Sequence, residues 1–133
     1  DIDRPSLDRL FRVANKAGLA EQLLGSAALL PAARTAVDGL WLMTAGRASG
    51  SASSLVTKGP LADTAAGWGL HDTSMLFYLA QRRGEQTPFG SILAGFDAVT
   101  IVARRGETAI ADMRRVIDDL DRHGVAIAGS VIA

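Results

Sequence analysis

A strand, a helix and a second strand follow one another in the last third of the chain, and this pattern constrains the fold most. The runs 98–103 (AVTIVA) and 125–132 (VAIAGSVI) are apolar and rich in β-branched residues, as buried strands are. Between them, apolar residues recur at helical spacing: Ile110, Met113, Val116, Ile117 and Leu120. Two strands joined by a crossover of this length form a parallel βαβ unit, which is right-handed in nearly all known cases. The pattern therefore predicts an α/β domain.

Two other short apolar runs predict further strands of the same sheet. Residues 39–46 (GLWLMTAG) are bounded by glycines, which is typical of a strand that is buried on both faces. Residues 73–80 (TSMLFYLA) form the second run. We therefore expect a mostly parallel sheet, flanked by helices, with four strands near the following residues: 39–45, 73–80, 97–103 and 125–132.

Helical signals fill much of the remaining chain. Pro5 suits the first turn of a helix, and Gly18 ends that helix. Three more helices are expected at 19–24, 29–36 and 55–66, the last with an interruption near Pro60. The segment 48–54 is rich in alanine, serine and glycine, so we expect it to be a loop.

Composition bounds the class of protein. A chain of 133 residues that is 48% hydrophobic suits one domain, residues 1–133, with a core of its own. Fourteen basic and fourteen acidic residues cancel, so no charge excess favours nucleic acid as a partner. The absence of cysteine excludes a disulfide framework and thiolate metal sites. No apolar run approaches the roughly 20 residues that span a bilayer, so we expect no membrane span in this chain.

The opening stretch, DIDRPSLDRLFRVANKAGLAEQLLG, resembles a segment of the bacterial tyrosine kinases of the polysaccharide co-polymerase type. These kinases are relatives of the MinD/ParA deviant-Walker ATPases. Their pattern runs roughly Asp-x-Asp-Leu-Arg-Arg-Pro-x-Leu-His-Arg-x-Phe, followed by Asn-x-x-Gly-Leu-x-x-x-Leu. The positions in step with it are Asp1, Arg4, Pro5, Leu7, Arg9, Phe11, Asn15, Gly18, Leu19 and Leu23. Three later segments are similar to family segments in the same order: GLWLMTAG, FDAVTIVARRGET and HGVAIAGSVIA.

The resemblance implies a partial P-loop NTPase fold of the Rossmann-like kind. It also implies that the chain is the carboxyl-terminal part of a larger P-loop domain, whose Walker A half lies upstream. Asp1 then matches the second aspartate of the Walker A′ motif and is the catalytic candidate. Arg4 and Arg104 are the cofactor-binding candidates, and no metal ligand is assigned. In such sheets ligands bind beyond the carboxyl ends of the strands, which here are followed by four segments: 1–5, 46–54, 81–90 and 104–108.

The intact family domain implies ATP and Mg²⁺ as cofactors, but this chain departs from the family at the residues that hold them. A phosphate-binding loop needs glycines and a lysine ahead of a helix, and neither Lys16 nor Lys58 has that setting. We therefore expect no cofactor on this chain alone. Phe77 aligns with the aspartate that organises Mg²⁺, and a phenylalanine offers no oxygen ligand.

Other family positions have changed as well. Ala52 and Ser54 replace the proline and glutamate of the family's Asn-Pro-x-Glu-Leu-Leu segment, and Ala133 replaces an asparagine near the base. The family's tyrosine-rich tail has no counterpart, because Tyr78 is the one tyrosine of this sequence. These changes predict a domain that is degenerate in catalysis.

Each candidate also has a purely structural interpretation. Asp1 ahead of a helix that starts with proline is also what a helix cap looks like. Arg104 and Arg105 either face an anion or form a solvated pair. His123 near the end of a helix favours the helix dipole, and it is too isolated to predict a metal site. The serines of residues 49–54 have no histidine or aspartate partner at a recognisable spacing, which disfavours nucleophilic catalysis.

Three functions stay open on this evidence. The first is a cytoplasmic kinase-like domain of an exopolysaccharide biosynthesis or export protein that regulates chain length. The second is a non-catalytic interaction module that contacts another copy of itself or the membrane-embedded part of the same export protein. The third is a MinD/ParA-like positioning ATPase, which would carry a basic amphipathic tail that this sequence does not show. The first two place the chain in the cytoplasm, at the inner face of the bacterial inner membrane through the rest of the parent protein.

Overall fold

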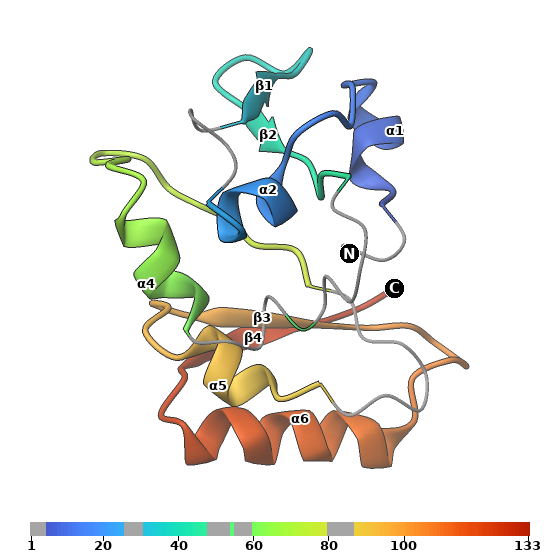
Figure 1. Cartoon of the computed structure of the whole chain (residues 1–133). Helices are drawn as coiled ribbons and strands as arrows, with labels where there is room; N and C mark the ends of the chain where they lie inside the picture. Colours follow the sequence, from blue (N-terminus) through green and yellow to red (C-terminus); the bar gives the residue numbers. More distant parts are fainter. Residues whose placement is uncertain (1–4, 26–30, 48–53, 55–59, 80–86) are drawn as a thin grey trace. The chain divides into compact units, whose positions relative to one another are not determined.

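The computed structural model describes residues 5–25, 31–47, 54, 60–79 and 87–133, which separate into two compact units. Unit 1 comprises Asp1–Lys58 and Leu70–Arg82, and unit 2 comprises Gly59–Gly69 and Arg83–Ala133. The elements of unit 1 are α1 (Leu7–Phe11), α2 (Leu19–Leu23), β1 (Ala32–Arg34) and β2 (Trp41–Met43). Those of unit 2 are α4 (Leu61–Ala66), α5 (Phe89–Leu93), β3 (Val99–Ala103), α6 (Ile110–Arg122) and β4 (Ile127–Ile132) (Figure 1).

Unit 2 contains the expected βαβ unit. Strands β3 and β4 pair in parallel, from Val99 opposite Ile127 to Ala103 opposite Ile132, with an irregularity between Val99 and Thr100. Helix α6 connects them and carries the apolar stripe that the sequence indicates. The stripe is most buried near its carboxyl end, where Leu120 is 0% exposed, whereas Ile110 in the first turn is 73% exposed. The βαβ prediction is confirmed.

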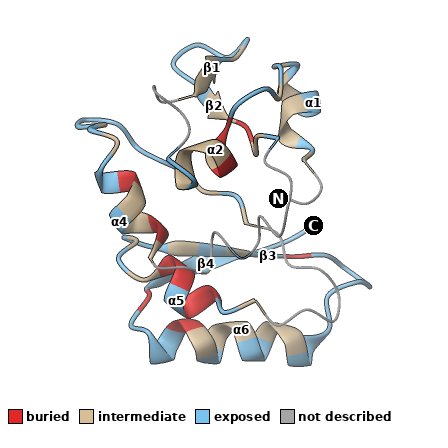
Figure 2. Ribbon diagram, in the orientation of Figure 1, coloured by how far each residue is buried: buried red, intermediate tan, exposed pale blue. Residues whose placement is uncertain are grey.

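The core of unit 2 is formed by three helices and the strand region. Its buried apolar residues are Leu61, Ala65, Phe89, Ile92, Leu93, Ala103, Leu120 and Val125. Helix α5 contributes three of these and packs on both α4 and α6, and buried positions occur on all three helices in Figure 2. The sequence did not indicate α5, because five residues are too short to show a helical period. Part of the candidate loop 81–90 is therefore the start of a helix.

Several segments of unit 1 differ from the expectation. The first helix ends at Phe11, well ahead of Gly18, because Arg12 takes a left-handed φ of 54°. Residues 29–36 were expected to be helical, yet Ala32–Arg34 form β1, while 29 and 30 lie outside the described residues. Strand β1 pairs antiparallel with β2, so the strand expected near 39–45 is present as Trp41–Met43 but is not part of a parallel sheet. The turn between them explains both results. The Thr35 amide donates to the Leu40 carbonyl at 3.2 Å, and Gly39 takes the left-handed φ of +76° that such a turn needs.

The strand expected at 73–80 is not observed. Residues 73–79 have no regular secondary structure, and residue 80 lies outside the described residues. Leu76 in this segment is 96% exposed. A strand exists only through its hydrogen-bonded neighbour, and among the described residues no neighbour pairs with this run. For the described residues, the mostly parallel sheet of four strands is therefore corrected to one parallel pair and one antiparallel pair.

None of the helices in the described part of the chain is both long and apolar enough to cross a membrane.

Candidate functional site

The residues predicted to form a nucleotide site are only partly placed by the structure. Asp1 and Arg4 lie outside the described residues. Arg104 follows β3, and its guanidinium lies 3.2 Å from a Glu107 carboxylate oxygen, with both side chains exposed. Its backbone amide donates to the Thr108 hydroxyl at 2.9 Å. An exposed ion pair of this kind contributes little to stability, so the geometry matches the solvated interpretation, and a role for Arg104 in binding a cofactor stays a prediction.

The densest polar network of unit 1 joins the segment before α2 to the segment after β2. The side chain of Asn15 contacts both backbone groups of Gly46. Its carbonyl oxygen accepts the Gly46 amide at 2.9 Å, and its amide nitrogen donates to the Gly46 carbonyl at 3.1 Å. Asn15 thus imitates a neighbouring strand and stabilises Gly46 at a φ of +91°, which a glycine adopts most readily.

Glu21 completes this network from the first turn of α2. One carboxylate oxygen accepts the Gly18 amide at 2.8 Å, as in a capping box, and the other accepts the Arg47 amide at 2.8 Å. The Arg47 guanidinium in turn donates through Nε to the backbone carbonyl of Asn15 at 2.9 Å. We call Asn15, Gly18, Glu21, Gly46 and Arg47 the junction cluster.

The backbone itself approaches closely at the junction cluster. The amides of Leu19 and Ala20 donate to the carbonyls of Thr44 and Ala45 at 2.8 and 3.0 Å. A Cβ atom added at Gly18 would overlap the Thr44 carbonyl. Only glycine permits this approach, which accounts physically for the glycine at this position.

The junction cluster brings together two segments that resembled the family separately. Asn15, Gly18 and Leu19 come from the first segment, and Gly46 ends the second. Sequence reasoning used Gly18 and Gly46 only as boundaries of a helix and a strand, gave Asn15 and Leu19 no role, and missed Glu21, which supplies the glutamate half of a capping box three residues after Gly18. Chemically, the cluster fixes where the chain leaves β2. It holds backbone amides and carbonyls and presents no nucleophile.

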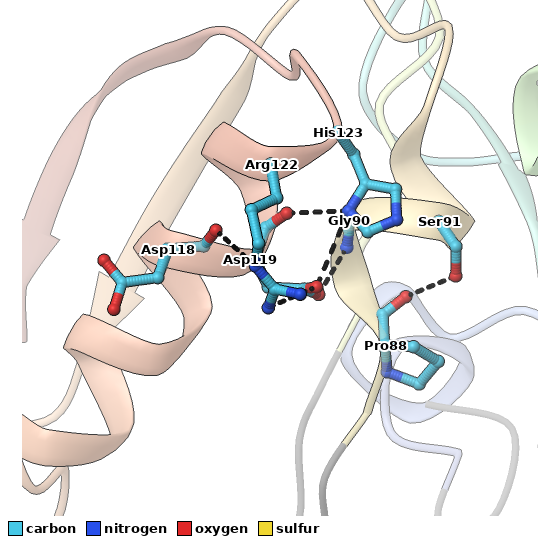
Figure 3. Close-up of polar contacts among 7 residues, drawn as sticks. All are labelled: Pro88, Gly90, Ser91, Asp118, Asp119, Arg122 and His123. Atoms are coloured by element: carbon cyan, nitrogen blue, oxygen red, sulfur yellow. Dashed lines mark hydrogen bonds and ion pairs between the residues drawn. The ribbon is translucent and has the colours of Figure 1, made fainter.

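A second polar cluster lies in unit 2, between α5 and α6 (Figure 3). The Asp119 carboxylate accepts the Gly90 amide at 2.7 Å and lies 3.2 Å from the Arg122 guanidinium. The Nδ1 atom of His123 lies 2.8 Å from the Asp119 carbonyl. Because a carbonyl only accepts, Nδ1 carries the proton in this contact. We call Asp119, Arg122, His123 and Gly90 the helix-pair cluster.

A serine lies beside the helix-pair cluster but does not form a catalytic triad with it. The Ser91 hydroxyl donates to the Pro88 carbonyl at 3.1 Å, within its own helix turn (Figure 3). The imidazole of His123 is bonded to backbone instead of to that hydroxyl. A nucleophilic serine needs a base within hydrogen-bond reach, so the arrangement supports the structural interpretation of His123. In the part of the chain that the structure describes, no three His, Cys, Asp or Glu residues group so that they could hold a metal ion.

Comparison with known proteins places the fold. No family model matches the chain, and no curated protein matches its sequence. The crystal structure of the VpsO kinase domain matches 99% of this chain, with a TM-score of 0.67 and 19% sequence identity. The BceF tyrosine kinase domain also matches 99% of the chain, with a TM-score of 0.65 and 22% identity. This chain spans 66% and 52% of those two structures, respectively. It therefore shares the fold of tyrosine kinase domains over nearly its whole length.

Proposed function

We propose that this chain is the carboxyl-terminal part of a tyrosine kinase-like P-loop domain from an exopolysaccharide biosynthesis or export protein, and that the domain is degenerate in catalysis. The observation that carries the proposal is the structural match, which extends over 99% of the chain. The unmatched third to half of each solved domain is consistent with a larger parent domain. The ordered family-like segments of the sequence add an independent reason.

The degeneracy rests on residue chemistry. Phosphoryl transfer depends on cations that neutralise charge at the transferring group, and these cations need oxygen ligands. Phe77 is half-buried and apolar at the position aligned with the metal-organising aspartate. The described residues around it therefore do not fit Mg²⁺, and we route no catalytic step through a metal on this chain. On this proposal Arg4 and Arg104 are the residues of this chain that would contact ATP, together with residues of the parent domain, and Asp1 is the catalytic residue.

The loss of that aspartate favours an interaction role for the domain. A kinase-like domain that has lost phosphoryl transfer still offers its surface to another copy of itself or to the membrane-embedded part of the same export protein. This proposal places the domain in the cytoplasm, at the inner face of the inner membrane.

The test is nucleotide binding by the full-length parent protein, measured by calorimetry with and without Mg²⁺. The proposal predicts that Mg²⁺ changes the affinity for ATP by less than about threefold, because the metal-organising oxygen is missing. An affinity that rises tenfold or more with Mg²⁺ would contradict the degeneracy. A parent protein without any phosphate-binding loop upstream would contradict the assignment to a P-loop domain.

A further inference from the structure

The side chain of Arg47 has more hydrogen-bonding groups than the junction cluster uses. Its Nε atom donates to the backbone carbonyl of Asn15 at 2.9 Å. A guanidinium carries further N–H groups on Nη1 and Nη2, and in Arg47 these make no hydrogen bond to the described part of the chain. Arg47 is exposed, so both groups are open to a ligand from solvent.

Two contacts hold this guanidinium in place. At the main chain, the Arg47 amide donates to a Glu21 carboxylate oxygen at 2.8 Å, which fixes the start of the side chain. At the other end of the side chain, the Nε bond to Asn15 fixes the plane of the guanidinium. An arginine that is already positioned loses less side-chain entropy when it binds an oxyanion. The junction cluster therefore pre-organises the Nη1 and Nη2 atoms for binding.

A second cation lies beside Arg47. The carbonyl that accepts from Nε belongs to the peptide bond between Asn15 and Lys16, so the two cationic side chains leave adjoining parts of the backbone. Lys16 is exposed, and its side chain makes no hydrogen bond within the described residues. Its ammonium group is carried on a flexible four-carbon stem. It can therefore reach a ligand that is bound at the guanidinium of Arg47.

The charge and the donor geometry of this pair favour a phosphate group. Arg47 and Lys16 are both cationic, whereas Glu21 is the one acidic residue of the junction cluster, so the local balance of charge is positive. A phosphomonoester carries about two negative charges at neutral pH and has three oxygens that accept hydrogen bonds. The planar fork of an arginine matches two such oxygens, which leaves the third for the ammonium. A carboxylate offers a single charge and no third oxygen.

We propose that Arg47 and Lys16 form a binding site for a phosphomonoester dianion, held in place by Asn15 and Glu21. Arg47 belongs to residues 46–54, one of the segments in which the sequence predicts ligand binding. Two sources supply such a dianion: free phosphate and a phosphorylated protein side chain. The site uses none of the residues that the proposed function assigns to ATP or to catalysis, so this proposal goes beyond that function and does not depend on it.

NMR of the full-length parent protein tests the site directly, because the Gly46 amide bonds to Asn15 inside the junction cluster and gives a signal of its own. Inorganic phosphate is titrated in one experiment and phenyl phosphate in another, at constant ionic strength. We expect the Gly46 amide signal and the Arg47 Nε–H signal to shift and to saturate. Tighter binding of phenyl phosphate would identify a phosphorylated aromatic side chain as the ligand, and equal or tighter binding of inorganic phosphate would identify free phosphate.

Three variants separate this site from a general effect of charge. Arg47→Gln removes the fork but keeps the backbone amide that bonds to Glu21, and we expect it to weaken phosphate binding about tenfold or more. Lys16→Gln removes a cation that makes no hydrogen bond in the described chain, so it tests the site without loosening the cluster, and we expect a loss of about threefold or more. Arg34→Gln is the matched control, since Arg34 is an exposed arginine of β1, and it should leave the affinity unchanged.

Three results would overturn the proposal. They are shifts that do not saturate with either ligand, full affinity in Arg47→Gln or in Lys16→Gln, and a loss in Arg34→Gln as large as that in Arg47→Gln. The calorimetric test of the proposed function measures the response of ATP binding to Mg²⁺ and does not depend on these signals. A parent protein with a strong Mg²⁺ response and a saturable shift at Gly46 would overturn the degeneracy alone, whereas the reverse pair of results would overturn the phosphate site alone.

Discussion

At the scale of single residues, Gly18 and Gly90 each lie so close to a neighbouring backbone that no larger residue fits. In the helix-pair cluster a Cβ atom at Gly90 would overlap both the His123 imidazole and the Asp119 carbonyl. The carbonyl belongs to the backbone of α6 and cannot rotate away. We expect Gly90→Ala to lower the free energy of unfolding by about 1–3 kcal/mol, as overpacking does. Chemical denaturation followed by circular dichroism measures this.

The control for Gly90 is the neighbouring residue. Ser91→Ala removes one exposed hydrogen bond to Pro88 and adds no atoms, so it should change stability by less than about 0.5 kcal/mol. Combining Gly90→Ala with His123→Ala should restore little, because the overlap with the Asp119 carbonyl remains. Full recovery in that double variant would mean that the histidine alone sets the spacing of the helices.

Glu21 illustrates what a carboxylate does that its amide isostere cannot. Both of its oxygens accept backbone amides, from Gly18 and Arg47. In Glu21→Gln one of these acceptors becomes an NH₂ group that faces an amide donor. We expect a loss of about 1.5–3 kcal/mol in the stability of unit 1, the range for hydrogen bonds to charged groups. Asp38→Asn is the charge-matched control, since Asp38 is exposed in the β1–β2 turn, and an equal loss there would show a general charge effect instead.

The sequence singled out some of the residues in these clusters but not their contacts. Asn15 and Gly18 were marked by the family-like pattern, but a pattern carries no information on partners. The hydrogen bonds of Asn15 to Gly46 and the close approach of Gly18 to the Thr44 carbonyl emerged only from the structure. Asp119 lies off the apolar stripe of its helix, and its carboxylate accepts the Gly90 amide at the start of α5. Contacts between residues 29 positions apart depend on tertiary packing, which periodicity alone does not encode.

At the scale of elements, α6 shows how a single apolar stripe is buried unequally along its length. Leu120 is fully buried and Ile110 is mostly exposed, although both belong to the same stripe. We expect Leu120→Ala to cost about 2–5 kcal/mol, as large-to-small changes in cores do. Ile110→Ala is the matched control and should lie within about 0.5 kcal/mol of the parent chain. Equal losses in urea unfolding would mean that the stripe is buried along its whole length.

The elements that the sequence predicted are those whose signals are local. Helix α6 shows an apolar period over 13 residues, helix α2 lies between Gly18 and Gly25, and β3 shows a β-branched run. Strand β1 was missed because Ala-Ala-Arg has a high helix propensity, which pairing with β2 overrides. The run 73–79 was assigned as a strand from its apolar content, but a strand also needs a partner, and pairing cannot be read from the run itself.

At the scale of the whole molecule, the fold can be assigned by comparison, whereas the chemistry of a site does not follow from that fold. The chain shares the fold of tyrosine kinase domains at 19% and 22% identity, and at that distance a fold is retained while individual site residues change. The βαβ unit followed from the sequence because it is a local pattern. The arrangement of a nucleotide site did not, because Asp1 and Arg4 lie outside the described residues.

The proposed catalytic silence is a property of the assembled parent protein and is tested there. We expect the parent to show no Mg²⁺-dependent tyrosine autophosphorylation above background, because Phe77 supplies no oxygen to a metal that must neutralise the transferring phosphoryl group. Phe77→Asp restores that oxygen and should raise incorporation of radiolabelled phosphate. Leu76→Asp is the matched control, since it adds the same charge one residue away at a position that is highly exposed. Stimulation by both variants would indicate a charge effect. Robust autophosphorylation by the unchanged parent, if Asp1→Asn abolishes it, would contradict the proposed silence. The metal-organising group would then lie elsewhere, and Asp1 would be a catalytic residue.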